Sequence, residues 1–155
     1  MKKILVIGSK GFIGTSARLY YESAGYLTYG CDILSDVSDR NYYQVSNKKS
    51  CYSDILNLVS PDLCLNASGS ARPYFSFKNP LNDYELNVVN VMKILDAIRI
   101  SSPKTVFINL SSAAVYGTPS KLPVNETQIL PLFLPTVGTR NKVKSCVMNT
   151  QIFLV

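Results

Sequence analysis

The chain has 155 residues, of which 46% are hydrophobic and 17% are charged, and its formal net charge is +6. This length and composition predict one globular domain and exclude a disordered chain. Lysine and arginine do not gather with aromatic residues along one face, so nucleic acid is not expected as a partner. No apolar run approaches the roughly 18 residues that a membrane span needs. We therefore expect a cytoplasmic protein that does not bind a membrane.

Short β-type runs alternate with helix-type runs along the chain. Strands are predicted at residues 3–8, 27–32, 42–45, 62–67 and 105–110, and helical spacing occurs between them at 13–24, 50–59 and 81–100. This alternation is typical of a parallel sheet wrapped by helices. The sequence therefore predicts the α/β class with a doubly wound parallel sheet.

The glycine-rich segment "ILVIGSKGFIG" joins the first predicted strand to the first predicted helix. It places Gly8, Gly11 and Gly14 at G-x-x-G-x-x-G spacing. The first glycine permits a sharp turn, the second lets the backbone approach a pyrophosphate, and the third lets helix and strand pack closely. The free amides and the dipole at the start of the helix favour an anion there. The segment therefore predicts a dinucleotide-binding turn.

Asp32 ends the second predicted strand, eighteen residues after Gly14. A carboxylate at this place can accept hydrogen bonds from both ribose hydroxyls of an adenosine, and it would repel a 2′-phosphate. This position predicts NAD as the cofactor in preference to NADP.

The cysteines show no C-x-x-C pair. Two of the four lie in or beside predicted strands, and the full set is Cys31, Cys51, Cys64 and Cys146. Reduced, partly buried thiols are favoured over a disulfide or a metal site, so no metal is expected.

The segment 81–100 is too apolar for an ordinary surface helix. Its apolar positions spread beyond one face and include Leu86, Val88, Val89, Val91, Met92, Ile94, Leu95 and Ile98. Such a helix is either packed between layers of one chain or shared with another subunit. Both alternatives stay open, and the second predicts a homodimer through helix 81–100.

Four motifs in order along the chain, "GSKGFIG", "LCLNASG", "ELNVVNVMKILDAIR" and "INLSSAAVYG", cover residues 3 to about 131. Together they resemble the extended short-chain dehydrogenase/reductases, namely the NAD-dependent epimerase/dehydratase family that acts on nucleotide sugars. The resemblance implies a Rossmann-type NAD(P)-binding domain at residues 1–132. It also implies that the sheet is incomplete here and that the C-terminal region that holds the nucleotide sugar is absent.

The resemblance also implies roles for particular residues. The serine four positions before Tyr116 becomes the catalytic residue, Ser112, which would donate a hydrogen bond to a sugar hydroxyl or ketone. Ala113 and Ala114 stand where dehydratases of the family carry an Asp-Glu pair, which favours an epimerase. The implied cofactor-binding residues are Gly8, Gly11, Phe12, Ile13, Gly14, Asp32, Ala67, Ser68, Gly69 and Asn87.

The family's catalytic Tyr-x-x-x-Lys pair does not appear where it is expected, after "NETQILPL". Lys142 is present, but Gly138, four residues before it, has no side chain to act as a base. Residues 133–155 contain three basic residues and no acid, so they form an atypical tail. One hypothesis is a single-base frameshift near residues 132–133 that hides the motif "SPYGWHK" in another reading frame. A Pro135 codon ending in A or G would rule out the hidden tyrosine.

Two functional classes stay open on the sequence. The first is an NAD-dependent nucleotide-sugar epimerase, which oxidises the sugar at C4 by hydride transfer to NAD and then reduces it again. This chain would be its cofactor-binding portion and would be inactive alone. The alternative is a non-catalytic dinucleotide-binding module, or a dehydratase or reductase of the same family. A third hypothesis is a non-functional truncated product.

Overall fold

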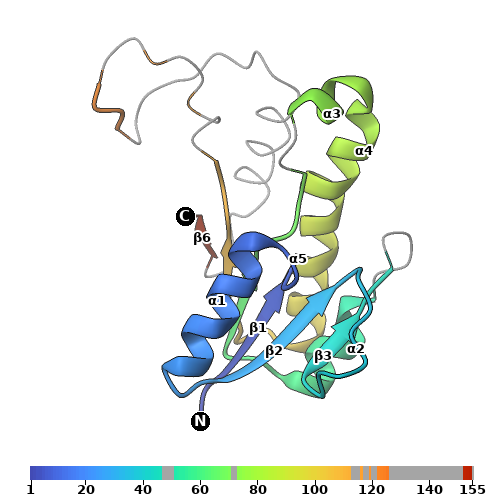
Figure 1. Cartoon of the computed structure of the whole chain (residues 1–155), viewed down its shortest axis with the longest axis vertical. Coiled ribbons are helices and arrows are strands. Elements are labelled where there is room, and N and C mark those ends of the chain that lie inside the picture. The colour runs from blue at the N-terminus through green and yellow to red at the C-terminus, as the bar shows by residue number, and fades with distance from the viewer. Residues whose placement is uncertain are drawn as a thin grey trace.

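A six-stranded parallel sheet forms the centre of the protein, with the strand order β3-β2-β1-β4-β5-β6 (Figure 1). The computed structural model describes residues 1–46, 51–70, 73–112, 116, 119, 122–125 and 152–154. The strands are β1 (Lys3–Ile7), β2 (Leu27–Asp32), β3 (Tyr42–Gln44), β4 (Leu63–Asn66), β5 (Val106–Asn109) and β6 (Ile152–Leu154). The first five confirm the predicted strands to within one residue at each end, and the α/β class with them.

The helices are α1 (Phe12–Ser23), α2 (Tyr52–Val59), α3 (Pro73–Lys78), α4 (Pro80–Tyr84), the π-helical turn η1 (Glu85–Val89) and α5 (Asn90–Ser101). The last three follow one another without a break, and together they form the helix predicted at 81–100. Helix α3 was not predicted from the sequence. None of the described helices is long and apolar enough to cross a membrane.

Strand β1 lies in the middle of the sheet and is buried on both faces. Leu5 and Ile7 face the larger core, which is covered by α2 and α5, whereas Ile4 and Val6 face a smaller cluster beneath α1. A strand covered by helices on both sides reads as a continuous apolar run, because neither face meets water. This burial fixes β1, and therefore the turn that follows it, rigidly in the sheet.

The helical stretch α4 to α5 buries only part of its apolar surface. Val88, Val91, Ile94 and Ile98 belong to the larger core, where they pack with residues of α2. The apolar side chains that remain exposed on the same stretch are Leu81, Tyr84, Met92 and Ile100. Packing within one chain therefore accounts for the inner face, and a homodimer through the outer face stays a prediction.

Strand β6 extends the sheet beside β5, where Phe107 pairs with Ile152 and Asn109 pairs with Leu154. It was not predicted, and it lies in the segment 133–155 that the sequence marks as an atypical tail. The rest of that segment, including Gly138 and Lys142, lies outside the described residues.

Candidate functional site

Four of the residues predicted to form a site lie at or just beyond the ends of neighbouring parallel strands, whose arrangement Figure 1 shows. Gly8 directly follows β1, Asp32 is the last residue of β2, Ala67 directly follows β4, and Ser112 lies three residues beyond β5. Parallel neighbouring strands end at the same edge of a sheet, and ligands of open α/β sheets bind in the crevice outside that edge. The topology therefore brings together segments that are up to a hundred residues apart in the sequence.

Gly8 packs against the turn after β4 with no room for a side chain. Its φ is +79°, and a Cβ placed on it would lie 2.6 Å from the backbone nitrogen of Ser68 and 2.8 Å from the carbonyl carbon of Ala67. A Cβ on Gly14 would lie 2.0 Å from the carbonyl oxygen of Gly8. Both positions therefore require glycine, because backbone packs directly on backbone. The turn is also closed by its own backbone, because the N–H of Gly8 donates to the Cys31 carbonyl at 2.7 Å and that of Gly11 donates to the Gly8 carbonyl at 3.1 Å.

Helix α1 starts at this turn and has no side-chain cap. Gly11 is its N-cap residue, with an extended backbone at φ −76° and ψ 167°. The N–H groups of a first helical turn have no partner within the helix, and the dipole places positive charge there. Phe12 and Ile13 follow, with 91% and 54% of their surface exposed. The start of α1 can therefore accept an anion and offers apolar contact beside it.

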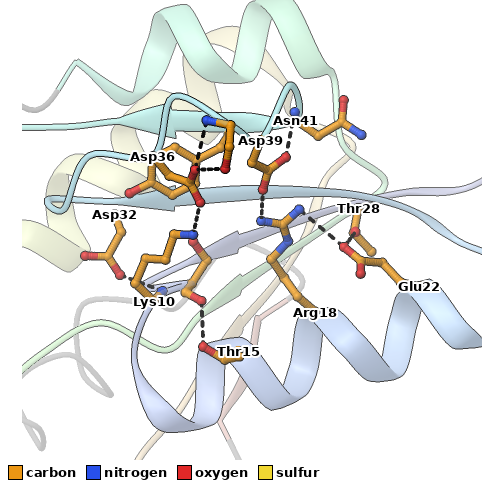
Figure 2. Close-up of polar contacts among 12 residues, drawn as sticks. Lys10, Thr15, Arg18, Glu22, Thr28, Asp32, Asp36, Asp39 and Asn41 are labelled. Carbon is orange, nitrogen blue, oxygen red and sulfur yellow. Dashed lines mark hydrogen bonds and ion pairs between the residues drawn. The ribbon is translucent and has the colours of Figure 1, made fainter.

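The Asp32 carboxylate is oriented by the backbone on both sides. Its Oδ2 accepts a hydrogen bond from the N–H of Lys10 at 2.8 Å (Figure 2). Its Oδ1 accepts one from the N–H of Ile33 at 2.7 Å. A carboxylate offers about four lone-pair positions, so each oxygen keeps one for a further donor. Asp32 is thus held beside the glycine turn with the capacity to bind two hydroxyl groups.

A buried chain of polar side chains supports the turn after β4. Asn66 Oδ1 accepts hydrogen bonds from the N–H of Ser68 at 3.1 Å and from its hydroxyl at 2.6 Å. Asn90 Nδ2 donates to Ser68 Oγ at 3.2 Å, and the Tyr52 hydroxyl donates to Asn90 Oδ1 at 2.9 Å. Asn66 Nδ2 also donates across the sheet to Asn109 Oδ1 at 2.7 Å. The turn and the end of β5 are therefore fixed relative to each other.

Asn87 faces the interior from the π-helical turn η1. It is 5% exposed, and its Oδ1 accepts a hydrogen bond from the N–H of Ser70 at 3.1 Å. Its Nδ2 donates at 2.9 Å to Asp83 Oδ1, which also accepts from the Ser76 hydroxyl at 2.6 Å. Single π-helical turns are frequent at functional sites. Asn87 therefore fixes the far end of the segment 67–70.

The expected catalytic serine lies at the same edge as the glycine turn. Ser112 is half-buried, and Tyr116 is also partly buried. Ala113 and Ala114 lie outside the described residues. Sequence reasoning missed the residues that orient the site, Lys10, Asn66, Asn90 and Asn109. Asn66 and Asn109 each end an otherwise apolar strand. A polar residue at that place is the signal that could have identified these two.

Two of the cysteines are buried in the core. Cys31 and Cys64 are both fully buried free thiols, and Cys51 is exposed. Burial raises the pKa of the Cys31 thiol to about 12, and the nearby Asp32 carboxylate adds to the effect. Burial raises the pKa of Cys64 as well. Both side chains act as apolar packing residues in the sheet.

We expect the cysteines to differ sharply in reactivity. At about pH 8, iodoacetamide should alkylate Cys51 and leave Cys31 and Cys64 unmodified, because the thiolate is the reactive form and a raised pKa lowers its fraction. Peptide mass spectrometry locates each modified residue. In urea all three should react, and rapid alkylation of Cys64 in the native chain would contradict its burial.

The parallel order β3-β2-β1-β4-β5, with a glycine-rich turn between β1 and α1, defines a Rossmann-type α/β fold. Residues 4–137 match the family described as NAD dependent epimerase/dehydratase. The chain belongs to this family.

Characterised relatives match this chain over part of their length. CDP-paratose 2-epimerase of Salmonella typhi is 28% identical over 139 residues, which are 81% of this chain and 41% of the relative. UDP-glucose 4-epimerase of Lactobacillus helveticus is 30% identical over 131 residues, 80% of this chain and 39% of the relative. The crystal structure of UDP-glucose 4-epimerase from Brucella ovis in complex with NAD matches with a TM-score of 0.88 at 23% identity. That match covers 99% of this chain and 50% of the other, and it supports the fold. The chain thus spans half or less of each of these relatives.

Proposed function

We propose that this chain is the cofactor-binding half of an NAD-dependent nucleotide-sugar epimerase and that it binds NAD at the carboxyl edge of its sheet. The observation that carries the proposal is the Gly8 turn. Its backbone packs directly on Ser68, and Lys10 in the same turn donates its N–H to the Asp32 carboxylate. This arrangement places the start of α1, which can bind a pyrophosphate, beside the Asp32 carboxylate, which can bind a ribose.

The donor set at this edge fits a dinucleotide. The N–H groups of Phe12 and Ile13 at the start of α1 suit the pyrophosphate, because they are positively polarised and have no partner within the helix. The Gly11 N–H already donates to the Gly8 carbonyl at 3.1 Å, so Gly11 contributes its lack of a side chain. The free acceptor positions of Asp32 suit the two hydroxyls of the adenosine ribose. The segment of Ala67, Ser68 and Gly69 offers small side chains where a flat ring can approach. Asn66 holds Ser68, and Asn87 holds Ser70 just beyond the segment.

NAD, when bound, supplies the acceptor and then the donor of the hydride at the sugar C4. Ser112 would donate a hydrogen bond to the sugar oxygen, which becomes more negative as its own proton leaves. A proton must also leave the C4 hydroxyl, and this step needs a base. Gly138 stands where the family's tyrosine is expected and cannot serve. We therefore propose that the chain is inactive alone. A frameshift after residue 132 is our hypothesis for the missing base.

The proposal is tested by two measurements on the same preparation. Calorimetry should show saturable binding of NAD and NADH, while an epimerase assay with UDP-hexoses should show no turnover above the buffer rate. Turnover would overturn the interpretation of Gly138. A folded chain that binds neither form of the cofactor would overturn the proposed function.

A second candidate function is a non-catalytic dinucleotide-binding module. The observation that favours it is Gly138 itself, because a module that only binds a cofactor needs no base. The coding DNA separates the two candidates. An open reading frame that continues in the shifted phase through a tyrosine codon supports the epimerase, and a shifted frame closed by stop codons supports the module.

A further inference from the structure

Two ion pairs fasten the segment 33–41, which follows Asp32, to the glycine turn and to α1 (Figure 2). Lys10 Nζ pairs with Asp36 Oδ2, and Arg18 Nη1 pairs with Asp39 Oδ2 at 2.5 Å. Arg18 Nη2 also lies 3.2 Å from Glu22 Oε1. The segment therefore cannot shift without separating charges.

The Asp36 carboxylate is held on both of its oxygens. Oδ1 accepts hydrogen bonds from the Ser38 N–H at 3.0 Å and from the Ser38 hydroxyl at 2.6 Å, while Oδ2 takes the Lys10 ammonium. The bond from Lys10, followed by those from Ser38, holds the pKa of Asp36 well below its usual range. Asp36 is thus a fixed negative charge at neutral pH, and its position is set by its own loop.

Lys10 lies next to the carboxylate that we assign to the ribose, yet its charge is directed elsewhere. Its backbone N–H donates to Asp32, whereas its ammonium reaches Asp36 and lies 4.9 Å from the centre of the Tyr42 ring. The Tyr42 hydroxyl in turn donates to the carbonyl of Leu34. Burial, with the Asp32 charge second, raises the pKa of Tyr42 to about 12, so it stays a neutral phenol beneath the ammonium.

The charges around the ribose position disfavour an additional anion. Asp32, Asp36 and Asp39 carry three negative charges against the two positive charges of Lys10 and Arg18, and each of these cations is already paired with a carboxylate. A 2′-phosphate carries roughly two negative charges at neutral pH and needs an available cation within hydrogen-bonding reach. Lys10, whose N–H binds Asp32, has its ammonium engaged by Asp36, so that charge is not available to a 2′-phosphate.

We propose that Asp36 is a cofactor-specificity residue, which keeps the Lys10 ammonium from a 2′-phosphate and so makes the site prefer NAD over NADP. This inference rests on the proposed function, because it assumes that the adenosine ribose lies at Asp32. It assigns the discrimination to two residues, since the Asp32 carboxylate repels the phosphate and Asp36 withholds the cation that would offset that repulsion.

The test compares the affinities of the whole chain for NADH and NADPH by calorimetry. Asp36→Asn keeps an oxygen for Ser38 but removes the charge that holds Lys10, so NADPH should bind roughly tenfold more tightly, the equivalent of about 1.4 kcal/mol. The affinity for NADH should stay within about twofold of the wild type, because that ligand carries no 2′-phosphate for the freed Lys10 to bind. Adding Lys10→Gln to Asp36→Asn should abolish the gain for NADPH.

Asp96→Asn is the matched control. It makes the same charge change in an exposed pair with Arg99 on α5 and should alter neither affinity. If the wild type binds NADH and Asp36→Asn leaves the NADPH affinity unchanged, the inference is wrong and the proposed function stands. A gain that persists in the double variant, or that Asp96→Asn reproduces, also contradicts it. If the folded wild type binds no NADH, the proposed function fails and this inference fails with it.

Discussion

Replacing Gly8 by alanine is expected to lower the free energy of unfolding much more than the same replacement at Gly25. The two glycines have nearly the same backbone conformation, with φ of +79° and +81°. The left-handed conformation alone costs an alanine about 1–2 kcal/mol at either position. A Cβ at Gly25 meets nothing within 4 Å, whereas one at Gly8 would lie 2.6 Å from the Ser68 nitrogen. Crowding of that kind adds about 1–3 kcal/mol at Gly8 alone.

Urea denaturation followed by circular dichroism measures both variants against the wild type. The difference between Gly8→Ala and Gly25→Ala isolates the close approach of the glycine turn to the β4 turn, because the conformational cost cancels. Equal losses of stability would mean that the two turns are not packed together as described.

The hydrogen bond between Asn66 and Asn109 is expected to contribute a measurable coupling energy to stability. These side chains are 2% and 8% exposed and pair across the ends of β4 and β5. Asn109→Leu leaves the buried Nδ2 group of Asn66 without this partner, which should cost about 1–3 kcal/mol. Asn66→Leu removes the same bond and also the acceptor of Ser68. The double variant should be less destabilised than the sum of the two, with a coupling of about 1–2 kcal/mol.

The measurement is a double-mutant cycle of unfolding free energies in urea. Asn57→Leu on the exposed side of α2 is the matched control and should change stability by less than about 0.5 kcal/mol. If the losses of unfolding free energy caused by Asn66→Leu and Asn109→Leu simply add in the double variant, the hydrogen bond between the two side chains contributes no coupling energy.

The strands could be predicted because their side-chain pattern is set by burial. Leu5 and Ile7 alternate with Ile4 and Val6, and all four are buried, so the apolar run in the sequence follows directly from the helices on both faces. The glycine turn was predictable for a similar reason. Close backbone approach leaves no room for a side chain, so glycine is required at fixed positions of the turn, and the spacing of the glycines in the sequence indicates those positions.

The supports of the site could not be predicted from local pattern. Asn66 and Asn109 are 43 residues apart, and their contact depends on the register of two strands. Lys10 and Asp36 are 26 residues apart, and their contact depends on the position of the segment that follows β2. The π-helical turn around Asn87 looks like ordinary helix in the sequence, because one extra residue per turn leaves no clear mark in the apolar spacing. Periodicity reveals which face is buried, and it does not reveal which polar groups meet.

The central claim is that NAD binds at the glycine turn, and the most direct test is an NADH titration of the wild type, Gly25→Ala and Gly8→Ala chains. Circular dichroism first confirms that each chain is folded at the chosen temperature. We predict that the wild type and Gly25→Ala bind NADH with similar affinity. Gly8→Ala should bind it far more weakly, because the turn has moved away from Ser68. Absence of binding by the folded wild type, or equal binding by Gly8→Ala, would contradict the claim.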